Sequence, residues 1–160
     1  TKTIDTQGSE SNITHRVIGV DVMPTAIKFG GVVTGLLNVH YLAVTSSCTK
    51  LTNLFADCIK LSSINTFGWD TQNVTDLSSM FDDCSQLIEI DLSQCNFKNV
   101  AGLYSTFYYC SGLETLHLPT TFTTKLISLG RTFWSCSKLS TITGLSEIDT
   151  SKVKNTDPSF

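Results

Sequence analysis

The sequence predicts an α/β repeat protein, a solenoid that has one parallel β-sheet and short helices on the side opposite the strands. Two observations carry this prediction. A motif of phenylalanine, cysteine and leucine returns every 26 residues, and an apolar Leu-x-x-Leu-x-Leu frame accompanies it. A unit of this size cannot bury its own apolar face, but units that stack on one another form a continuous core.

The repeated motif is clearest at four cysteines, each of which lies 26 residues after the one before it. Every one of them follows a phenylalanine by three residues and precedes a leucine by three. The four motifs are Phe55-x-x-Cys58-x-x-Leu61, Phe81-x-x-Cys84-x-x-Leu87, Phe107-x-x-Cys110-x-x-Leu113 and Phe133-x-x-Cys136-x-x-Leu139. Four matches at one fixed period indicate a structural repeat.

The end of each unit alternates between apolar and other residues, as a strand with one buried face does. The steps from Val17 to Val39 and from Val39 to Leu61 are 22 residues, and the later steps are 26. Thr66 occupies a position where the frame requires an apolar residue. The frame predicts parallel strands, stacked in one sheet in chain order, near residues 17–22, 39–44, 61–66, 87–92, 113–118 and 139–144.

Short helices are predicted in the segments that precede these strands. Leu77, Met80 and Phe81 follow the i, i+3, i+4 spacing of a helix face. Thr75 or Asp76 has the side chain of a helix N-cap. Equivalent spacing in the other units predicts helices around 49–57, 75–83, 101–109 and 127–135.

The chain is expected to divide at residue 17. Residues 1–16 carry no repeat and are interpreted as an N-terminal extension or cap. Residues 17–160 are interpreted as the solenoid, with two 22-residue coils followed by 26-residue coils. Asp149 begins a further copy of the motif part that starts at Asp70, and the sequence stops at Phe160, the phenylalanine of that copy. The last coil is therefore expected to be truncated, in a natural product that continues further.

Composition excludes several classes of partner. Of the 160 residues, 41% are hydrophobic and 16% are charged, and the formal net charge is −3. Serine and threonine replace the missing charges and make up about a quarter of the chain, well above their usual share. No basic stripe is present, so nucleic acid is not an expected partner. No apolar run reaches the ~20 residues of a membrane span, so no transmembrane segment is expected.

The stretch from Trp69 to Phe81 reads Trp-Asp-Thr-Gln-Asn-Val-Thr-Asp-Leu-Ser-Ser-Met-Phe, and Cys84 and Leu87 follow it. This pattern resembles the 26-residue unit of the BspA-like leucine-rich-repeat family of bacterial surface proteins. The resemblance covers roughly residues 17–160. It implies a curved leucine-rich-repeat solenoid that is displayed on the cell surface or secreted and that serves adhesion and protein binding without catalysis.

The regular spacing of the cysteines predicts a ladder of free thiols. Neighbours in such a ladder lie about 4.8 Å apart with parallel Cβ vectors, whereas a disulfide needs Cβ atoms roughly 3.8 Å apart and turned toward each other. Cys48 and Cys95 lie outside the ladder and are the better candidates for exposure or pairing. No Cys-x-x-Cys pair exists, so no metal site is predicted. Buried, reduced thiols are predicted for Cys58, Cys84, Cys110 and Cys136.

No catalytic site and no cofactor are predicted. The chain lacks a nucleophile motif such as Gly-x-Ser-x-Gly, and none of His15, His40 and His117 has a recognisable catalytic partner. The repeated phenylalanines are interpreted as an aromatic spine of the core. Trp69 occurs once in the repeat, and its position, in the core or on the surface, stays open.

The outward side chains of the strands form the candidate binding face. Such faces of stacked repeats commonly bind ligands, although this one could also be ordinary solvated strand surface. Asp91 and His117 are expected about 4.8 Å apart on neighbouring strands, which predicts ligand binding that varies with pH near 6–7. The outward pairs are Gly19/Asp21, Tyr41/Ala43, Ser63/Asn65, Glu89/Asp91, Thr115/His117 and Thr141/Thr143. The ligand-binding residues predicted among them are Tyr41, Glu89, Asp91 and His117.

The function expected from these observations is an adhesin-like interaction module whose partner is a protein, such as a host extracellular-matrix or surface protein. The alternative is a non-catalytic carbohydrate-recognition, scaffold or spacer domain of a larger surface protein or hydrolase. A further alternative places the contacts on the convex loops around Trp69 or Phe97 rather than on the strands.

Overall fold

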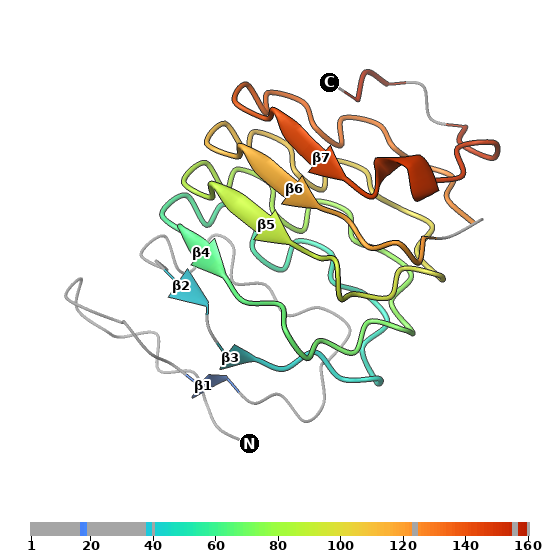
Figure 1. Ribbon diagram of the computed structural model, residues 1–160, viewed down its shortest axis with the longest axis horizontal. Coiled ribbons are helices and arrows are strands. Elements are labelled where there is room, and N and C mark those ends of the chain that lie inside the picture. The colour runs from blue at the N-terminus through green and yellow to red at the C-terminus, as the bar shows by residue number, and fades with distance from the viewer. Residues whose placement is uncertain (1–16, 19–37, 40, 123–124, 155–156, 160) are drawn as a thin grey trace.

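The computed structural model describes residues 17–18, 38–39, 41–122, 125–154 and 157–159. Figure 1 shows β4 to β7 following one another in chain order, with the rest of each unit running behind the strands. The elements are β1 (Val17–Ile18), β2 (Asn38–Val39), β3 (Tyr41–Leu42), β4 (Ser63–Ile64), β5 (Glu89–Asp91), β6 (Thr115–His117), β7 (Thr141–Thr143) and the 3-10 helix η1 (Leu145–Glu147).

Every strand pair is parallel, as predicted, and the 26-residue step is the register of the main sheet. β5, β6 and β7 form this sheet in chain order, with Ile90 opposite Leu116 and Leu116 opposite Ile142. The prediction of a single sheet is wrong, because β1 pairs with β3 and β2 pairs with β4 in two separate sheets.

Thr66 lies just beyond β4 and contacts the unit of β5, although β4 and β5 belong to separate sheets. In the next unit the backbone N–H of Leu92 donates to the carbonyl of His117. At the equivalent place, 26 residues earlier, it is the hydroxyl of Thr66 that donates to the carbonyl of Asp91. A side-chain hydrogen bond thus joins these two units just beyond β4, where the apolar frame of the sequence is interrupted.

The 22-residue steps predicted for the early units are wrong among the described residues. Val39 pairs with Ile64, a step of 25, and Ile18 pairs with Leu42, a step of 24. Val39, Leu42 and Val44 are all buried, with 6%, 4% and 2% of their surface exposed. Because all three positions of the frame reach the core, the apolar pattern does not distinguish between these registers.

The division proposed at residue 17 stays a prediction. Residues 1–16 and 19–37 lie outside the described residues, as do Gly19, Asp21, His15 and His40.

The predicted helices are wrong: residues 49–57, 75–83, 101–109 and 127–135 form successive tight turns or irregular backbone. The backbone N–H groups of Asn53 and Asp57 donate to the next unit, at Ser78 and Asp82, instead of within their own segment. Both residues have positive φ, 56° and 63°, which an α-helix cannot contain. The same two positions are repeated at 26-residue steps in the following units, at Ser79 and Asp83, Ser105 and Tyr109, and Arg131 and Ser135.

The i, i+3, i+4 spacing in the sequence therefore indicates which residues are buried, and it does not indicate a helix. Leu77, Met80 and Phe81 are 1% exposed or less. Leu77 and Phe81 donate their backbone N–H groups to Gly102 and Thr106 of the next unit, while Met80 closes a three-residue turn on Leu77. Along this segment, backbone N–H groups that donate to the next unit thus alternate with N–H groups that donate within their own turn.

The repeated phenylalanines form the predicted aromatic spine. Ring centroids of consecutive members lie 5.5, 5.7 and 5.6 Å apart, with interplanar angles of 16°, 8° and 2°. Trp69 also belongs to the core, since it is 6% exposed and its indole Nε1 donates to the carbonyl of Leu42 at 2.8 Å. The stacked rings are Phe55, Phe81, Phe107 and Phe133.

The predicted free thiols are confirmed, and Cys58, Cys84 and Cys110 are fully buried, but the predicted burial of Cys136 is wrong, since it is only half-buried. Each thiol after the first donates to the carbonyl of the phenylalanine 29 residues earlier, at distances of 3.1, 3.0 and 3.0 Å. The expectation that Cys48 and Cys95 are more exposed is wrong, since they are 2% and 3% exposed. Cys48 donates to the carbonyl of Lys50, and Cys95 lies beside the hydroxyl of Thr71.

The last described residues continue the stack. Lys154 donates its backbone N–H to Ile127, and Phe133 donates its own to Ser159. The hydroxyl of Ser159 donates to the carbonyl of Leu129 at 2.8 Å.

Phe107→Ala is expected to lower the free energy of unfolding by about 3–5 kcal/mol, because it removes a ring stacked on both sides in the core. Phe67, which is 82% exposed, provides the matched control. Phe67→Ala should change the stability by less than about 0.5 kcal/mol. Urea denaturation followed by circular dichroism measures both, and similar losses from the two variants would contradict the spine.

Thiol labelling should be slow in the folded protein and complete after unfolding without reductant. Burial raises the pKa of the Cys136 thiol to about 11 and holds that of Cys110 well above the ordinary value. Little reactive thiolate therefore exists at pH 8. Mass spectrometry after iodoacetamide pulses should find Cys136 modified before Cys84 and Cys110. Thiols that stay unreactive after unfolding until reductant is added would disprove the free ladder.

Candidate ligand-binding faces

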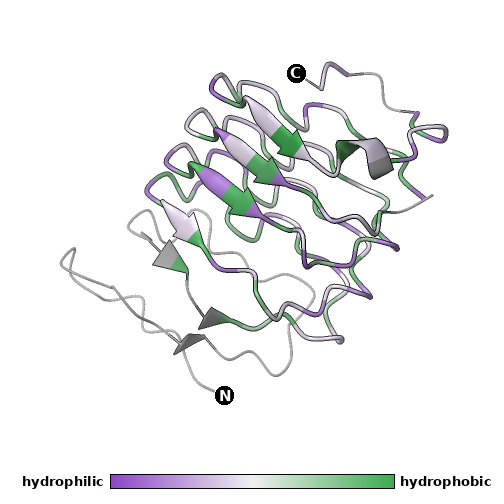
Figure 2. Cartoon of the chain, viewed as in Figure 1, coloured by the Kyte–Doolittle hydropathy of each residue, from purple (hydrophilic) through white to green (hydrophobic). Residues whose placement is uncertain are grey.

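The strand face carries two rows of polar side chains. Along β5 and β6 buried residues alternate with exposed or half-buried ones, and Figure 2 shows the matching alternation of hydropathy. The parallel register aligns these residues across the sheet. The first row consists of Glu89, Thr115 and Thr141, and the second of Asp91, His117 and Thr143.

His117 connects three strands of this face. Its Nδ1 atom lies 2.9 Å from the hydroxyl of Thr143 on β7, and its Nε2 atom lies 3.6 Å from a carboxylate oxygen of Glu89 on β5. The imidazole is about one-third exposed, with 31% of its side-chain surface accessible. These two contacts favour one orientation of the imidazole, and the solvent-exposed contact with Glu89 contributes little stability.

Asp91 lies opposite His117 in the sheet register, as predicted, although the carboxylate that lies 3.6 Å from the Nε2 atom of His117 is that of Glu89. Hydrogen bonds from Ser93, assisted by the charge of His117, lower the pKa of the Asp91 carboxyl. Glu89, Asp91 and His117 thus form one polar group on adjacent strands.

The structure does not place Tyr41 with this group. Its backbone belongs to β3 and pairs with Val17 of β1, in a sheet separate from β5–β7. Its side chain lies outside the described residues. The role predicted for Tyr41 stays a prediction.

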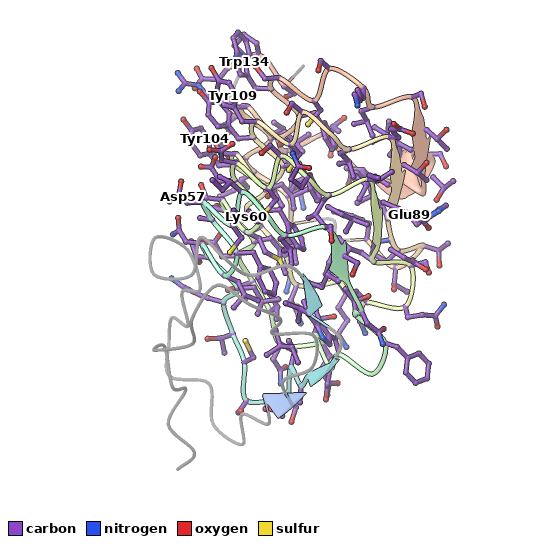
Figure 3. The ribbon with its side chains drawn as sticks, turned by 90° about the vertical axis from the view of Figure 1, so that its left-hand side faces the viewer. Asp57, Lys60, Glu89, Tyr104, Tyr109 and Trp134 are labelled. Atoms are coloured by element: carbon purple, nitrogen blue, oxygen red, sulfur yellow. The ribbon has the colours of Figure 1, made fainter. Side chains whose placement is uncertain are left out.

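A second surface, opposite the strands, was not predicted from the sequence. Figure 3 shows Tyr104, Tyr109 and Trp134 along the edge opposite Glu89. Tyr109 and Trp134 are 46% and 38% exposed. In the tight turns of this edge these side chains point outward. The predicted helices gave no indication of that orientation. The only signal in the sequence is the run of aromatic residues from 104 to 109 together with Trp134 one unit later.

The alternative that contacts use the loops around Trp69 or Phe97 stays a prediction: these two side chains are buried, but Phe67, two residues before Trp69, is 82% exposed. Trp69 is 6% exposed and Phe97 is 2% exposed. Phe97 packs edge-on against Phe122, with ring centroids 5.8 Å apart. Both side chains belong to the core.

Three carboxylates lie beside the exposed aromatic residues. Burial, followed by the charges of Asp57 and Asp83, raises the pKa of the half-buried Asp82 carboxyl to about 6. Burial and Asp57 also raise the pKa of Asp83. The charges on this edge therefore destabilise one another in the folded protein.

A shallow hollow of about 300 Å³ lies over a ladder of parallel bridges between units. Gly102 keeps it open, because a Cβ atom there would lie 2.9 Å from Oδ1 of Asp76. That oxygen accepts hydrogen bonds from the backbone N–H and the hydroxyl of Ser78. Tyr104 and Ile127 supply the apolar part of the wall.

Within the described ranges, no group of three or more His, Cys, Asp or Glu side chains is arranged to hold a metal ion. Among the described residues, no helix is long enough and apolar enough to span a membrane.

Asp82→Asn is expected to raise the free energy of unfolding at pH 7 by about 1 kcal/mol, after allowance for solvent screening of a half-buried carboxylate. With its pKa near 6 instead of the ordinary 3.8, folded Asp82 keeps a proton that the unfolded chain has lost. The contribution of this carboxyl to stability therefore falls as pH rises from about 4 to 6.

Urea unfolding of Asp82→Asn and wild type at pH 4, 5 and 7 measures this effect. The difference between the two proteins should be largest at pH 7 and should disappear near pH 4. An equal difference at all three pH values would show that the carboxylate charge is not its cause.

Comparison of the chain with known protein families finds a match. The family model described as "Mycoplasma protein of unknown function, DUF285" matches residues 42–122. Neither the curated proteins nor the solved structures compared with the chain contain a significant match. The matched range includes Glu89, Asp91 and His117, and also the three carboxylates and Tyr109.

Proposed function

The chain belongs to the family of Mycoplasma proteins of unknown function, DUF285, and we propose that it is an interaction module that binds a protein ligand through its strand face. The module acts on the cell surface or in secreted form and has no catalytic role. Its ligand is a protein such as a host extracellular-matrix or surface protein.

The observation that carries this proposal is the polar group on β5 and β6. Glu89, Asp91 and His117 are accessible and lie on one parallel sheet, where contacts from His117 to Glu89 and Thr143 cross three strands. Side chains that are ordered before binding lose less entropy on binding. The face is open and not enclosed, which suits the surface of a macromolecule better than a small molecule.

The finer architecture is part of the proposal. We infer that the units build a leucine-rich-repeat solenoid of the BspA-like type. The 26-residue register of β5–β7, the phenylalanine stack and the thiol ladder support it. The surface location rests on the resemblance of the Trp69 to Phe81 stretch to BspA-like repeats.

The hollow at Gly102 favours a second candidate function, carbohydrate recognition within a larger scaffold. Tyr104 offers an aromatic side chain at the wall, and Asp76, Thr75 and Ser128 offer polar groups around it. A sugar ring presents apolar C–H groups and hydroxyls, which match such a lining. Gly102→Ala would place a methyl group 2.9 Å from Oδ1 of Asp76 and so disturb the hollow without changing a residue of the strand face.

The test is a binding screen of the whole chain against extracellular-matrix proteins and glycans, followed by variants measured by surface plasmon resonance. Combined substitution of Glu89, Asp91 and His117 by Ala should weaken binding of a protein ligand at least tenfold. The control changes Gln86 and Lys152, which are exposed outside the strands, to Ala and should leave affinity unchanged.

A protein ligand that binds the triple variant as tightly as wild type would disprove the strand-face proposal. A glycan whose binding is abolished by Gly102→Ala and unaffected by the triple variant would favour the second candidate. Tyr41→Ala, measured separately, tests the remaining predicted residue. The pH dependence predicted for His117 is read from the same titrations at pH 5.5 and 7.5, with His117→Ala as its control.

A further inference from the structure

The edge opposite the strands carries a continuous ridge of carboxylates and aromatic rings. Successive units are joined there by backbone hydrogen bonds of 2.8 Å from Asp57 to Asp82, from Asp83 to Tyr108 and from Tyr109 to Trp134. Four successive units therefore bring the acidic residues directly beside the aromatic ones. We name this surface the acidic-aromatic ridge; it comprises Asp57, Asp82, Asp83, Tyr108, Tyr109 and Trp134.

Packing does not account for the aromatic end of the ridge. Tyr109 has φ of 54°, a left-handed conformation that costs a bulky residue free energy. It is also 46% exposed, and its ring contact among the described residues is an edge contact with Tyr108, at 4.6 Å between centroids. Trp134, 38% exposed, has no ring contact in that part of the chain. Large exposed aromatic residues of this kind are typical of binding surfaces.

Charge indicates what would bind there. Among the described residues, the ion pairs join Glu89 with His117 and Arg131 with Asp157, and none involves the three carboxylates of the ridge. Arg131, the nearest guanidinium on the aromatic side, is already held by Asp157 at 3.7 Å. Lys60 lies on the same edge as Asp57 (Figure 3) and takes part in neither of these ion pairs. With this lysine counted, the three carboxylates still leave the ridge an excess of negative charge next to accessible π faces.

A guanidinium or ammonium group satisfies both halves of such a surface. It pairs with a carboxylate and also lies favourably over a tyrosine or tryptophan ring within about 6 Å. We propose that the acidic-aromatic ridge is a second interaction surface, which binds a basic protein segment rich in arginine or lysine, independently of the strand face.

The experiment titrates the whole chain at pH 7 with a hexa-arginine peptide, and with hexa-glutamate as the negative control. Isothermal calorimetry gives the affinity, and the fluorescence of the exposed Trp134 reports local contact. Hexa-arginine should bind and quench the fluorescence, and its affinity should fall as salt is added. Hexa-glutamate should not bind.

Three double variants locate the site. Asp82→Asn with Asp83→Asn should weaken hexa-arginine binding at least fivefold, and Tyr109→Ala with Trp134→Ala should do the same. Glu89→Gln with Asp91→Asn removes two charges from the opposite face and should leave the affinity within twofold of wild type. Thermal unfolding of each variant verifies the fold, and Asp57→Asn replaces the acidic pair if that pair is unfolded.

The proposal is overturned if the acidic variant, or its replacement, binds hexa-arginine as tightly as wild type. It is also overturned if the strand-face variant weakens binding as much as the ridge variants, since attraction would then depend only on net charge. These outcomes do not bear on the strand-face function, because that function is measured with a different ligand and different residues.

Discussion

Backbone hydrogen bonds between successive units, and not within them, are the constraint on which the rest of the structure depends. In the segments opposite the strands, alternate residues donate to the next unit, as Phe55 does to Met80 and Phe81 to Thr106. This pattern holds equivalent residues in adjacent units side by side. The phenylalanine rings therefore stack at about the same spacing as the backbones, and each later thiol reaches a carbonyl of the unit before it.

The same constraint makes the surface a set of columns, in which each position is repeated at 26-residue steps. Inside the molecule some columns keep their residue type, as the phenylalanines and cysteines do, while one buried column changes from Leu54 and Met80 to Thr106 and Thr132. Outside it the residue type is free to change along the column: Asp57 and Asp83 are followed by Tyr109. Both proposed binding surfaces arise in this way, from variable columns on opposite sides of one conserved scaffold of hydrogen bonds.

The sequence predicted the features that depend on burial. Parallel strands at 26-residue register, the aromatic spine and the free thiols all follow from apolar residues at a fixed period. The helices failed because i, i+3, i+4 spacing describes which residues are buried, and a chain of turns buries Leu77, Met80 and Phe81 equally well. Cys48 and Cys95 were misjudged because small residues outside the main motif also line the core.

The candidate sites show the same division. Strand alternation was sufficient to place Glu89, Asp91 and His117 on one face, but it did not predict the contact between Glu89 and His117. The ridge was missed because its orientation depends on positive φ at Asp57, Asp83 and Tyr109, which no periodic pattern encodes. Similarly, the early registers depend on which of three buried residues pairs with Ile64.

Bonds that run from unit to unit also determine how such a chain responds to mechanical load. A force that pulls the last unit away from the stack loads the hydrogen bonds of a single interface, and these can break in sequence like a zipper. Each released unit of 26 residues would lengthen the molecule by on the order of 90 Å when fully extended. The interfaces behind it would remain intact, so the chain could dissipate a pull stepwise while most of its surface stayed folded.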